Sequence, residues 1–170
     1  MQNFSNKNSD NDSKQPVAPK KTTSNPLLGK LDLIGSIIMI LGLFIGQFYK
    51  ADGGAYAVTY GAPGYRLIFN SDMIMGTLLI LLPAIVLITD FVPGLKKYDK
   101  LIKFALPIVT FILVFVLKGQ AGDELTSGDE GAKLAIGGWI YLLGNLAALA
   151  AGASKFFGFD LEEKISQIKK

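Results

Sequence analysis

The sequence predicts an all-α membrane protein: a four-transmembrane-helix bundle with a β-prone extracytoplasmic hairpin and a C-terminal amphipathic helix. Three observations predict this class. The chain of 170 residues is 50% hydrophobic and only 18% charged, with a mean hydropathy of +0.38, as is typical of membrane proteins. Four long stretches contain no charged residue, and the lysines are unevenly distributed between the two sides of those stretches.

The N-terminal segment, residues 1–28, is rich in Asn, Ser, Lys and Pro and contains one aromatic residue, Phe4. Such a composition cannot bury enough apolar surface to offset the entropy lost on ordering. We therefore expect a disordered cytoplasmic tail, followed by a membrane domain over residues 29–154.

Four uncharged stretches carry the prediction of four spans: residues 33–49, 73–89, 104–117 and 134–154. A spanning helix needs about 20 largely apolar residues. The third stretch is long enough if Leu101 and Ile102 join it and Lys103 extends its ammonium to the interface; a re-entrant segment is the alternative. The expected spans are residues 31–49, 72–92, 101–118 and 134–154.

Lysine and arginine predict the orientation. With four spans, the side that holds both termini carries 13 basic residues and the other side carries 4. Both termini of this multi-pass protein are therefore expected in the cytoplasm. No basic stripe with interleaved aromatic residues is present, so nucleic acid is not an expected partner.

The two outer segments differ in character. Residues 50–72 contain two β-prone runs joined by the Pro63–Gly64 dipeptide, which predicts a hairpin. Its aromatic side chains are expected to contact the bundle, the lipid headgroups or another subunit: Tyr56, Tyr60, Tyr65 and Phe69. Residues 118–133 are acidic and glycine-rich and lack a calcium-binding pattern.

The C-terminal segment, residues 155–170, predicts a short amphipathic helix. Leu161, Ile165 and Ile168 share one face of such a helix, opposite Glu162 and Glu163. It is expected to lie on the cytoplasmic membrane surface, or to dock on another protein.

Chemically active residues are scarce. The chain has no Cys and no His, which removes thiol nucleophiles, the usual metal ligands and the usual general base. The four uncharged stretches also lack the ionisable residues that transport and proteolysis usually require. Ser36 and Thr110 are expected to bond helix carbonyls. We predict no catalytic, cofactor-binding or metal-binding residue, and no enzyme activity.

Small residues give the clearest interaction signal. In lipid, such residues at four-residue spacing let helix backbones approach closely, and they recur in the first and fourth spans: Gly42, Gly46, Gly144, Ala148 and Gly152. They are expected to pack within this chain, with an intersubunit contact as the alternative. Gln47 and Asn145 are expected to hydrogen-bond to another helix, or to line a pore.

Acidic residues occur at the expected ends of the spans. Asp32 and Asp72 lie where a carboxylate caps a helix N-terminus. Asp90 lies at a C-terminal end, where the helix dipole disfavours negative charge, so an ion pair with Lys96 or Lys97 is expected.

These observations favour a non-enzymatic accessory or scaffold subunit of a membrane complex. Its expected partners are the lipid bilayer and other membrane subunits or further copies of itself. The alternative is a homo-oligomeric channel or carrier for a small solute, with Gln47, Asn145 and the threonines lining a pore at the oligomer axis. An enzyme acting on lipid is a distant third. The excess of lysine, 16 to 1 arginine, points to an AT-rich genome and a bacterial cell membrane.

Overall fold

The computed structural model describes residues 27–53, 58–69, 74–126 and 131–168, which are mostly helical and include one small sheet. The predicted disordered tail therefore lies almost wholly outside the described residues, as do Tyr56 and Asp72. The helical elements are η1 (Leu28–Lys30), α1 (Leu31–Phe44), α2 (Gly64–Phe69), η3 (Ile74–Thr77), α3 (Leu78–Ile88), α4 (Pro93–Lys96), α5 (Asp99–Thr126), α6 (Ile136–Phe157) and α7 (Leu161–Ile168). The strands are β1 (Tyr49–Gly53), β2 (Val58–Ala62) and β3 (Lys133–Leu134).

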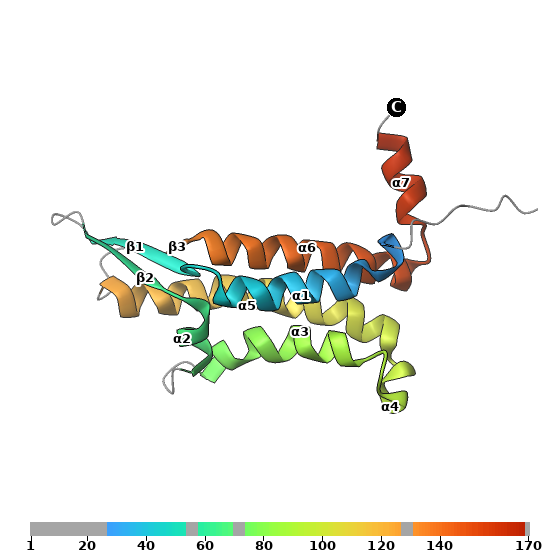
Figure 1. Cartoon of the computed structure of the whole chain (residues 1–170), viewed down its shortest axis with the longest axis horizontal. Coiled ribbons are helices and arrows are strands. Elements are labelled where there is room, and N and C mark those ends of the chain that lie inside the picture. Colours follow the sequence, from blue (N-terminus) through green and yellow to red (C-terminus); the bar gives the residue numbers. More distant parts are fainter. Residues whose placement is uncertain (1–26, 54–57, 70–73, 127–130, 169–170) are drawn as a thin grey trace, which may run out of the picture.

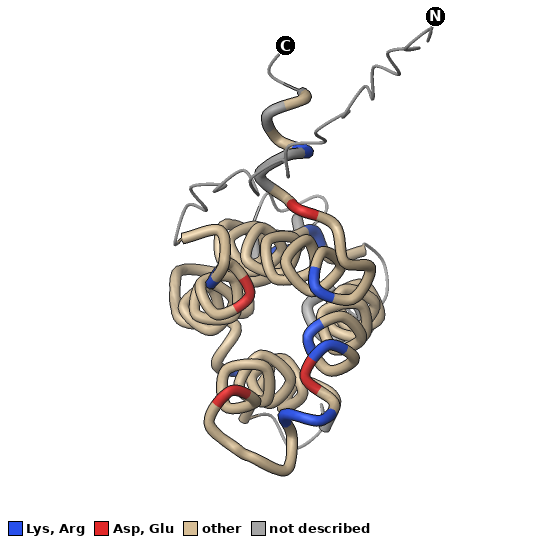
Figure 2. The backbone as a smooth tube through the Cα atoms, turned by 90° about the vertical axis from the view of Figure 1, so that its right-hand side faces the viewer, with Lys and Arg blue, Asp and Glu red and all other residues tan. Residues whose placement is uncertain are grey.

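Four long helices form the body of the molecule and run alternately up and down (Figure 1). Helix α1 packs against α6 and α3, and α5 packs against the same two helices. A view along their length shows the four helices around a common axis (Figure 2). The sheet lies at one end of the helices, and α4 and α7 lie at the other end (Figure 1).

Glycines end two of these helices. After α1, Ile45 is extended and Gly46 has φ +63°, a left-handed conformation that glycine adopts without steric cost. After α6, Gly158 has φ +73°, and its N–H donates to the Ser154 carbonyl, as is common at helix C-termini.

The sheet has the strand order β2-β1-β3, and both pairs are antiparallel. A hairpin is present in the region where one was predicted, but its turn and its second strand are not at the predicted positions. Its strands pair Tyr49 with Ala62 and Gly53 with Val58. Pro63–Gly64 is not the hairpin turn. Proline lacks the N–H that would extend the strand, and the run after it forms α2 instead of a second strand.

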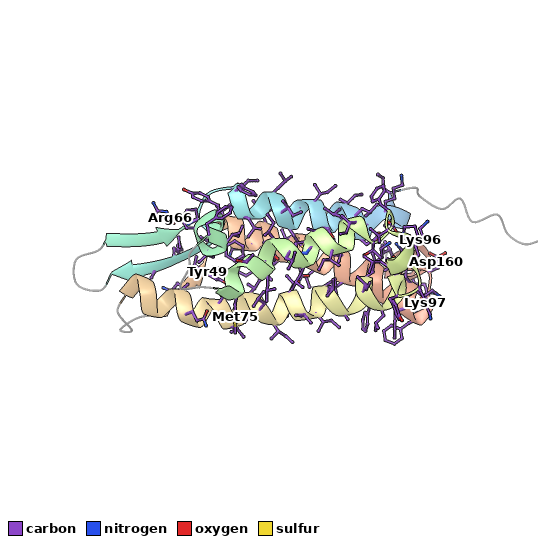
Figure 3. All side chains as sticks on the ribbon, turned by 90° about the horizontal axis from the view of Figure 1, so that it is seen from below. Tyr49, Arg66, Met75, Lys96, Lys97 and Asp160 are labelled. Carbon is purple, nitrogen blue, oxygen red and sulfur yellow. The ribbon has the colours of Figure 1, made fainter. Side chains whose placement is uncertain are left out.

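Aromatic residues join the sheet to the helices. Tyr49 and Tyr141 are both fully buried, and Phe48 contacts each of them edge to face, with ring centroids 4.9 Å and 5.3 Å away. The Tyr49 hydroxyl donates to the Val114 carbonyl in α5, and the Tyr141 hydroxyl donates to the Leu79 carbonyl in α3 at 2.6 Å. Figure 3 shows Tyr49 at this end, between strand and helices.

Two helices of the described residues are long and apolar enough to cross a membrane: Asp99–Ala121 within α5, and α6. The prediction of four such helices is therefore supported for two of them. Helix α1 has 14 residues and α3 has 11, fewer than the roughly 17 that a span requires. The uncharged stretch 33–49 is longer than its helix because the chain turns at Gly46 and continues as strand β1.

Candidate functional site: a buried ion-pair cluster

Among the described residues, Lys103 is a buried lysine with only 2% of its surface exposed. Its ammonium Nζ lies 2.6 Å from Asp90 Oδ1, 2.8 Å from Asp99 Oδ1 and 3.1 Å from Asp32 Oδ2. The second lysine of the group, Lys155, lies 2.7 Å from the same Asp32 oxygen. We call these five residues the ion-pair cluster.

Each of the four long helices contributes to the cluster at or near its end. Asp32 is in the first turn of α1, and Asp90 follows α3 by two residues. Asp99 begins α5 and Lys103 lies one turn later, while Lys155 is in the last turn of α6. The up-and-down order brings these ends together. Charged residues accordingly gather at the near end of the helices in Figure 2.

Burial differs across the cluster. Asp32 is 1% exposed, whereas Asp90, Asp99 and Lys155 reach the surface. Three carboxylates face two ammonium groups, which gives a formal charge of −1. Two buried oxygens of the cluster, Asp32 Oδ1 and Asp99 Oδ1, have no hydrogen-bond partner among the described residues.

A glycine lets α6 approach α5 closely at this site. A Cβ at Gly152 would collide with the Lys103 carbonyl and would lie 3.0 Å from Phe104 Cα. Next to this contact the rings of Phe104 and Phe156 stack with centroids 4.9 Å apart. The backbone at Lys103 therefore packs directly against α6.

Three expectations for these charges are wrong. Asp90 pairs with Lys103 and not with Lys96 or Lys97, because the start of α5 folds back against the end of α3. Lys103 does not extend to the interface but is enclosed by three carboxylates. Asp32 does not cap α1, whose N-cap position is Lys30 with no side-chain hydrogen bond.

One local signal in the sequence points to part of the cluster. Asp99 and Lys103 are four residues apart, which places them on one face of a helix. The other contacts join Lys103 of α5 to Asp32 of α1 and to Asp90 after α3. Lys155 of α6 meets Asp32 across 123 positions, so these contacts depend on how the helices are arranged.

The predicted small-residue positions lie mostly between helices of this chain. A Cβ at Gly42 would meet Tyr141 N at 2.8 Å, and one at Gly144 would meet Gly35 O at 2.6 Å. Ala148 is buried against Gly35, so α1 and α6 touch backbone to backbone. Gly152 makes the α5 contact described above, and Gly46 lies beside the Ile136 side chain after α1 ends.

The interior between the helices also contains polar side chains. Ser36, Thr89 and Thr110 are buried, and each hydroxyl donates to the carbonyl four residues earlier, as expected for Ser36 and Thr110. Asn145 is fully buried, but neither of its amide atoms has a hydrogen-bond partner among the described residues. The predicted interhelical hydrogen bond of Asn145 is therefore wrong.

The contact between α5 and α6 shows where Asn145 lies along the axis of the helices. Gly152 packs against Lys103, and Asn145 and Thr110 each lie seven residues from that contact toward the sheet. At about 1.5 Å per residue the two are at the same height. A buried polar layer therefore lies about 10 Å inside the ion-pair cluster.

The predicted outer contact residues are placed in part. Tyr65 and Phe69 lie one turn apart on α2, and both are exposed, Phe69 to 79%. Tyr56 and the side chain of Tyr60 lie outside the described residues.

This arrangement is suited to holding helices together. The Lys103 ammonium lies within 3.1 Å of carboxylates from three different segments of the chain. The described residues contain no group of three or more acidic, His or Cys side chains arranged to hold a metal ion. Comparison with protein families, curated proteins and solved structures found no match.

Proposed function

We propose that this chain is a multi-pass integral membrane protein whose four long helices lie in the bilayer. One observation carries the proposal: large apolar side chains are exposed on the outside of every long helix. They include Ile37, Leu41 and Phe44 of α1, Leu78, Leu81 and Ile88 of α3, Val109, Ile112, Phe115 and Val116 of α5, and Leu143 and Leu146 of α6. Exposed apolar side chains on every long helix are unusual for a soluble monomer, which rarely exposes contiguous apolar patches larger than a few hundred Å².

The distribution of polar groups supports the same proposal. Asp32, Lys103, Thr110 and Asn145 are enclosed between the helices while the outer surface is apolar. In a bilayer, charged side chains face the interior of a helix bundle and pair with one another. A soluble protein has the opposite arrangement, with its charges in water.

The orientation is proposed from the ends of the helices. Lys96, Lys97 and Asp160 lie at the end that holds the ion-pair cluster, and Arg66 lies at the sheet end (Figure 3). Most lysines belong to the cluster end, so we assign that end and both termini to the cytoplasm. The sheet and α2 are then extracytoplasmic.

Within the membrane we propose a non-enzymatic role as an accessory or scaffold subunit. The small-residue contacts described above are made inside the chain, so a partner would meet the large outer side chains. Tyr65 and Phe69 on α2 extend this surface beyond the helices. Aromatic side chains of this kind are enriched at protein interfaces.

The channel alternative has less support. An oligomeric pore would be lined by polar side chains on the outer surface. Asn145, Thr89 and Thr110 are instead buried inside the chain, and only Gln47 and Thr77 of the described residues considered for a pore are exposed.

Single-cysteine labelling tests the membrane topology, since the natural chain has no cysteine. Gly29, Gly94 and Gly131 are exposed, and a Cβ at any of them meets no atom within 4 Å, so each accepts cysteine. In right-side-out vesicles an impermeant maleimide should label Gly131→Cys, but Gly29→Cys and Gly94→Cys only after permeabilisation. Ile112→Cys, on the lipid-facing side, should react only in detergent. Equal labelling of all four in intact vesicles would refute the topology.

The accessory role is tested separately by native mass spectrometry after gentle detergent extraction. A foreign membrane subunit at fixed stoichiometry is the expected result. The Phe69→Ser variant should lose it, and the Phe91→Ser variant at the opposite end should keep it. A homo-oligomer without foreign subunits would contradict the accessory role and favour the channel.

A further inference from the structure

Proline interrupts two of the four long helices. Pro83 lies inside α3, and Pro107 lies inside α5. Proline has no N–H, and its ring clashes with the carbonyl four residues earlier, so that carbonyl loses its donor within the helix. The two carbonyls concerned belong to Leu79 and Lys103. In an apolar interior each of them needs a donor from another part of the chain.

The Leu79 carbonyl receives its hydrogen bond from α6. The Tyr141 hydroxyl donates to it at 2.6 Å, and Tyr141 and Leu79 are both fully buried. Phe48 packs edge to face against the Tyr141 ring, with centroids 5.3 Å apart, and so helps to hold the ring in place. The hydroxyl of α6 therefore replaces the N–H that Pro83 lacks.

This hydrogen bond crosses the helix bundle. Helices α3 and α6 lie on opposite sides of it, and α1 and α5 pack against both (Figure 1). The far end of α3 is held by another contact, between Asp90 and Lys103 of α5 at 2.6 Å. The part of α3 after Pro83 is thus tied to α6 near its start and to α5 just beyond its end.

The second proline shows a weaker form of the same arrangement. The Lys103 carbonyl, four residues before Pro107, faces Gly152 of α6, where a Cβ would collide with it. In glycine a Cα hydrogen takes that place, and a Cα–H group is a weak donor. Helix α6 therefore meets both carbonyls, and the bond to α3 is the one that a single hydroxyl supplies.

We propose that Pro83 forms a hinge in α3 and that the hydrogen bond from Tyr141 keeps this hinge closed. Without that bond the Leu79 carbonyl has no donor, and α3 bends more readily at Pro83. The inference goes beyond the accessory role and depends neither on it nor on the membrane location, because an unpaired carbonyl is costly in any apolar interior.

A double-mutant cycle in the full-length protein tests the hinge. In mixed micelles, Tyr141→Phe should raise the ratio of unfolded to folded protein roughly tenfold, because it leaves a buried carbonyl unpaired. Pro83→Ala returns an N–H to residue 83, which then bonds the Leu79 carbonyl within α3. In that background Tyr141→Phe should change the ratio only about twofold. Equal effects in the two backgrounds would overturn the proposal.

Tyr49→Phe is the matched control. It removes an equally buried hydroxyl, which donates to the Val114 carbonyl in α5. The residue four positions later is Lys118, which has an N–H for that carbonyl. Tyr49→Phe should therefore have the same effect with and without Pro83. A Tyr49→Phe effect that shrinks in the Pro83→Ala background as much as that of Tyr141→Phe would contradict the assignment to Tyr141.

Hydrogen exchange followed by mass spectrometry tests the hinge without altering Pro83. The backbone amides of residues 84–88 should exchange faster in Tyr141→Phe than in the wild type, since the opening of α3 is no longer opposed by the hydrogen bond. In Tyr49→Phe they should exchange at the wild-type rate. Unchanged exchange of these amides in Tyr141→Phe would overturn the proposal even if Pro83→Ala does not fold.

Discussion

At the residue scale, Lys103 connects more of the molecule than any other described side chain. Its ammonium contacts carboxylates from α1, from α5 and from the segment after α3, and Asp32 extends the contacts to α6 through Lys155. A buried ion pair adds little net stability compared with apolar residues of similar size, but loss of one partner leaves an uncompensated charge. The cluster therefore specifies how the four helix ends meet.

Replacing Lys103 should show how far the stability of the protein depends on the ion-pair cluster. In Lys103→Met the buried Asp32 keeps its ion pair with Lys155 but loses the one with Lys103. Asp90 and Asp99 lose their ion pairs with Lys103. We expect a loss of about 3–5 kcal/mol in the free energy of unfolding, measured by denaturation in mixed micelles.

Lys100→Met is the matched control. It removes the same charge from an exposed position on the same helix, and its effect should stay within about 0.5 kcal/mol. Adding Asp32→Leu to Lys103→Met should recover part of the loss. Equal stability of the two single variants would contradict the role assigned to the cluster.

At the element scale, the close contact between α1 and α6 depends on glycines, which have no Cβ atom. Gly35, Gly42 and Gly144 bring the two backbones within van der Waals distance. Packing of this kind stabilises helix pairs in lipid, where the hydrophobic effect between helices is absent. Glycine is therefore required at these positions because the two backbones are too close for a Cβ atom, although glycine itself lowers helix stability.

The same substitution should have opposite effects at two glycines. Gly144→Ala places a Cβ 2.6 Å from Gly35 O and 2.8 Å from Met39 N, which forces α1 and α6 apart and should cost about 1–3 kcal/mol. Gly119→Ala on α5 meets nothing within 4 Å and should stabilise the helix by up to about 1 kcal/mol. Thermal unfolding of both variants in one detergent measures the difference. Stabilisation by Gly144→Ala would show that the helices are not in contact there.

The elements differ in how far the sequence predicts them. Apolar runs locate the four long helices because a continuous hydrophobic segment is a local property. The hairpin was misplaced because the aromatic run after Pro63 has a preference for strand that its surroundings override, a known weakness of β propensity. For the ion-pair cluster, the sequence indicates the Asp99–Lys103 pair. It does not indicate the contacts of Lys103 with Asp32 and Asp90, which arise only when three helix ends converge.

At the scale of the whole molecule, the lengths of the helices are unequal. At about 1.5 Å per residue, the 14 residues of α1 extend about 21 Å and the 11 of α3 about 17 Å. The apolar part of α5, with 23 residues, extends about 35 Å. The hydrocarbon core of a typical bilayer is about 30 Å thick. If all four helices are embedded, the bilayer has to be thin beside α1 and α3, while α5 can tilt.

This mismatch predicts that the protein is most stable in thin bilayers. Mismatch costs a fraction of a kcal/mol per Å, and the short helices α1 and α3 lie on the same side of the molecule, since they pack against each other. Thermal unfolding in nanodiscs of increasing acyl length, at a constant headgroup composition, should give a maximum below the usual thickness of about 30 Å. A constant headgroup composition leaves the thickness of the bilayer as the variable along the series. A midpoint that rises steadily with thickness would mean that α1 and α3 do not limit the fit, because the membrane meets the molecule through α5 and α6 alone.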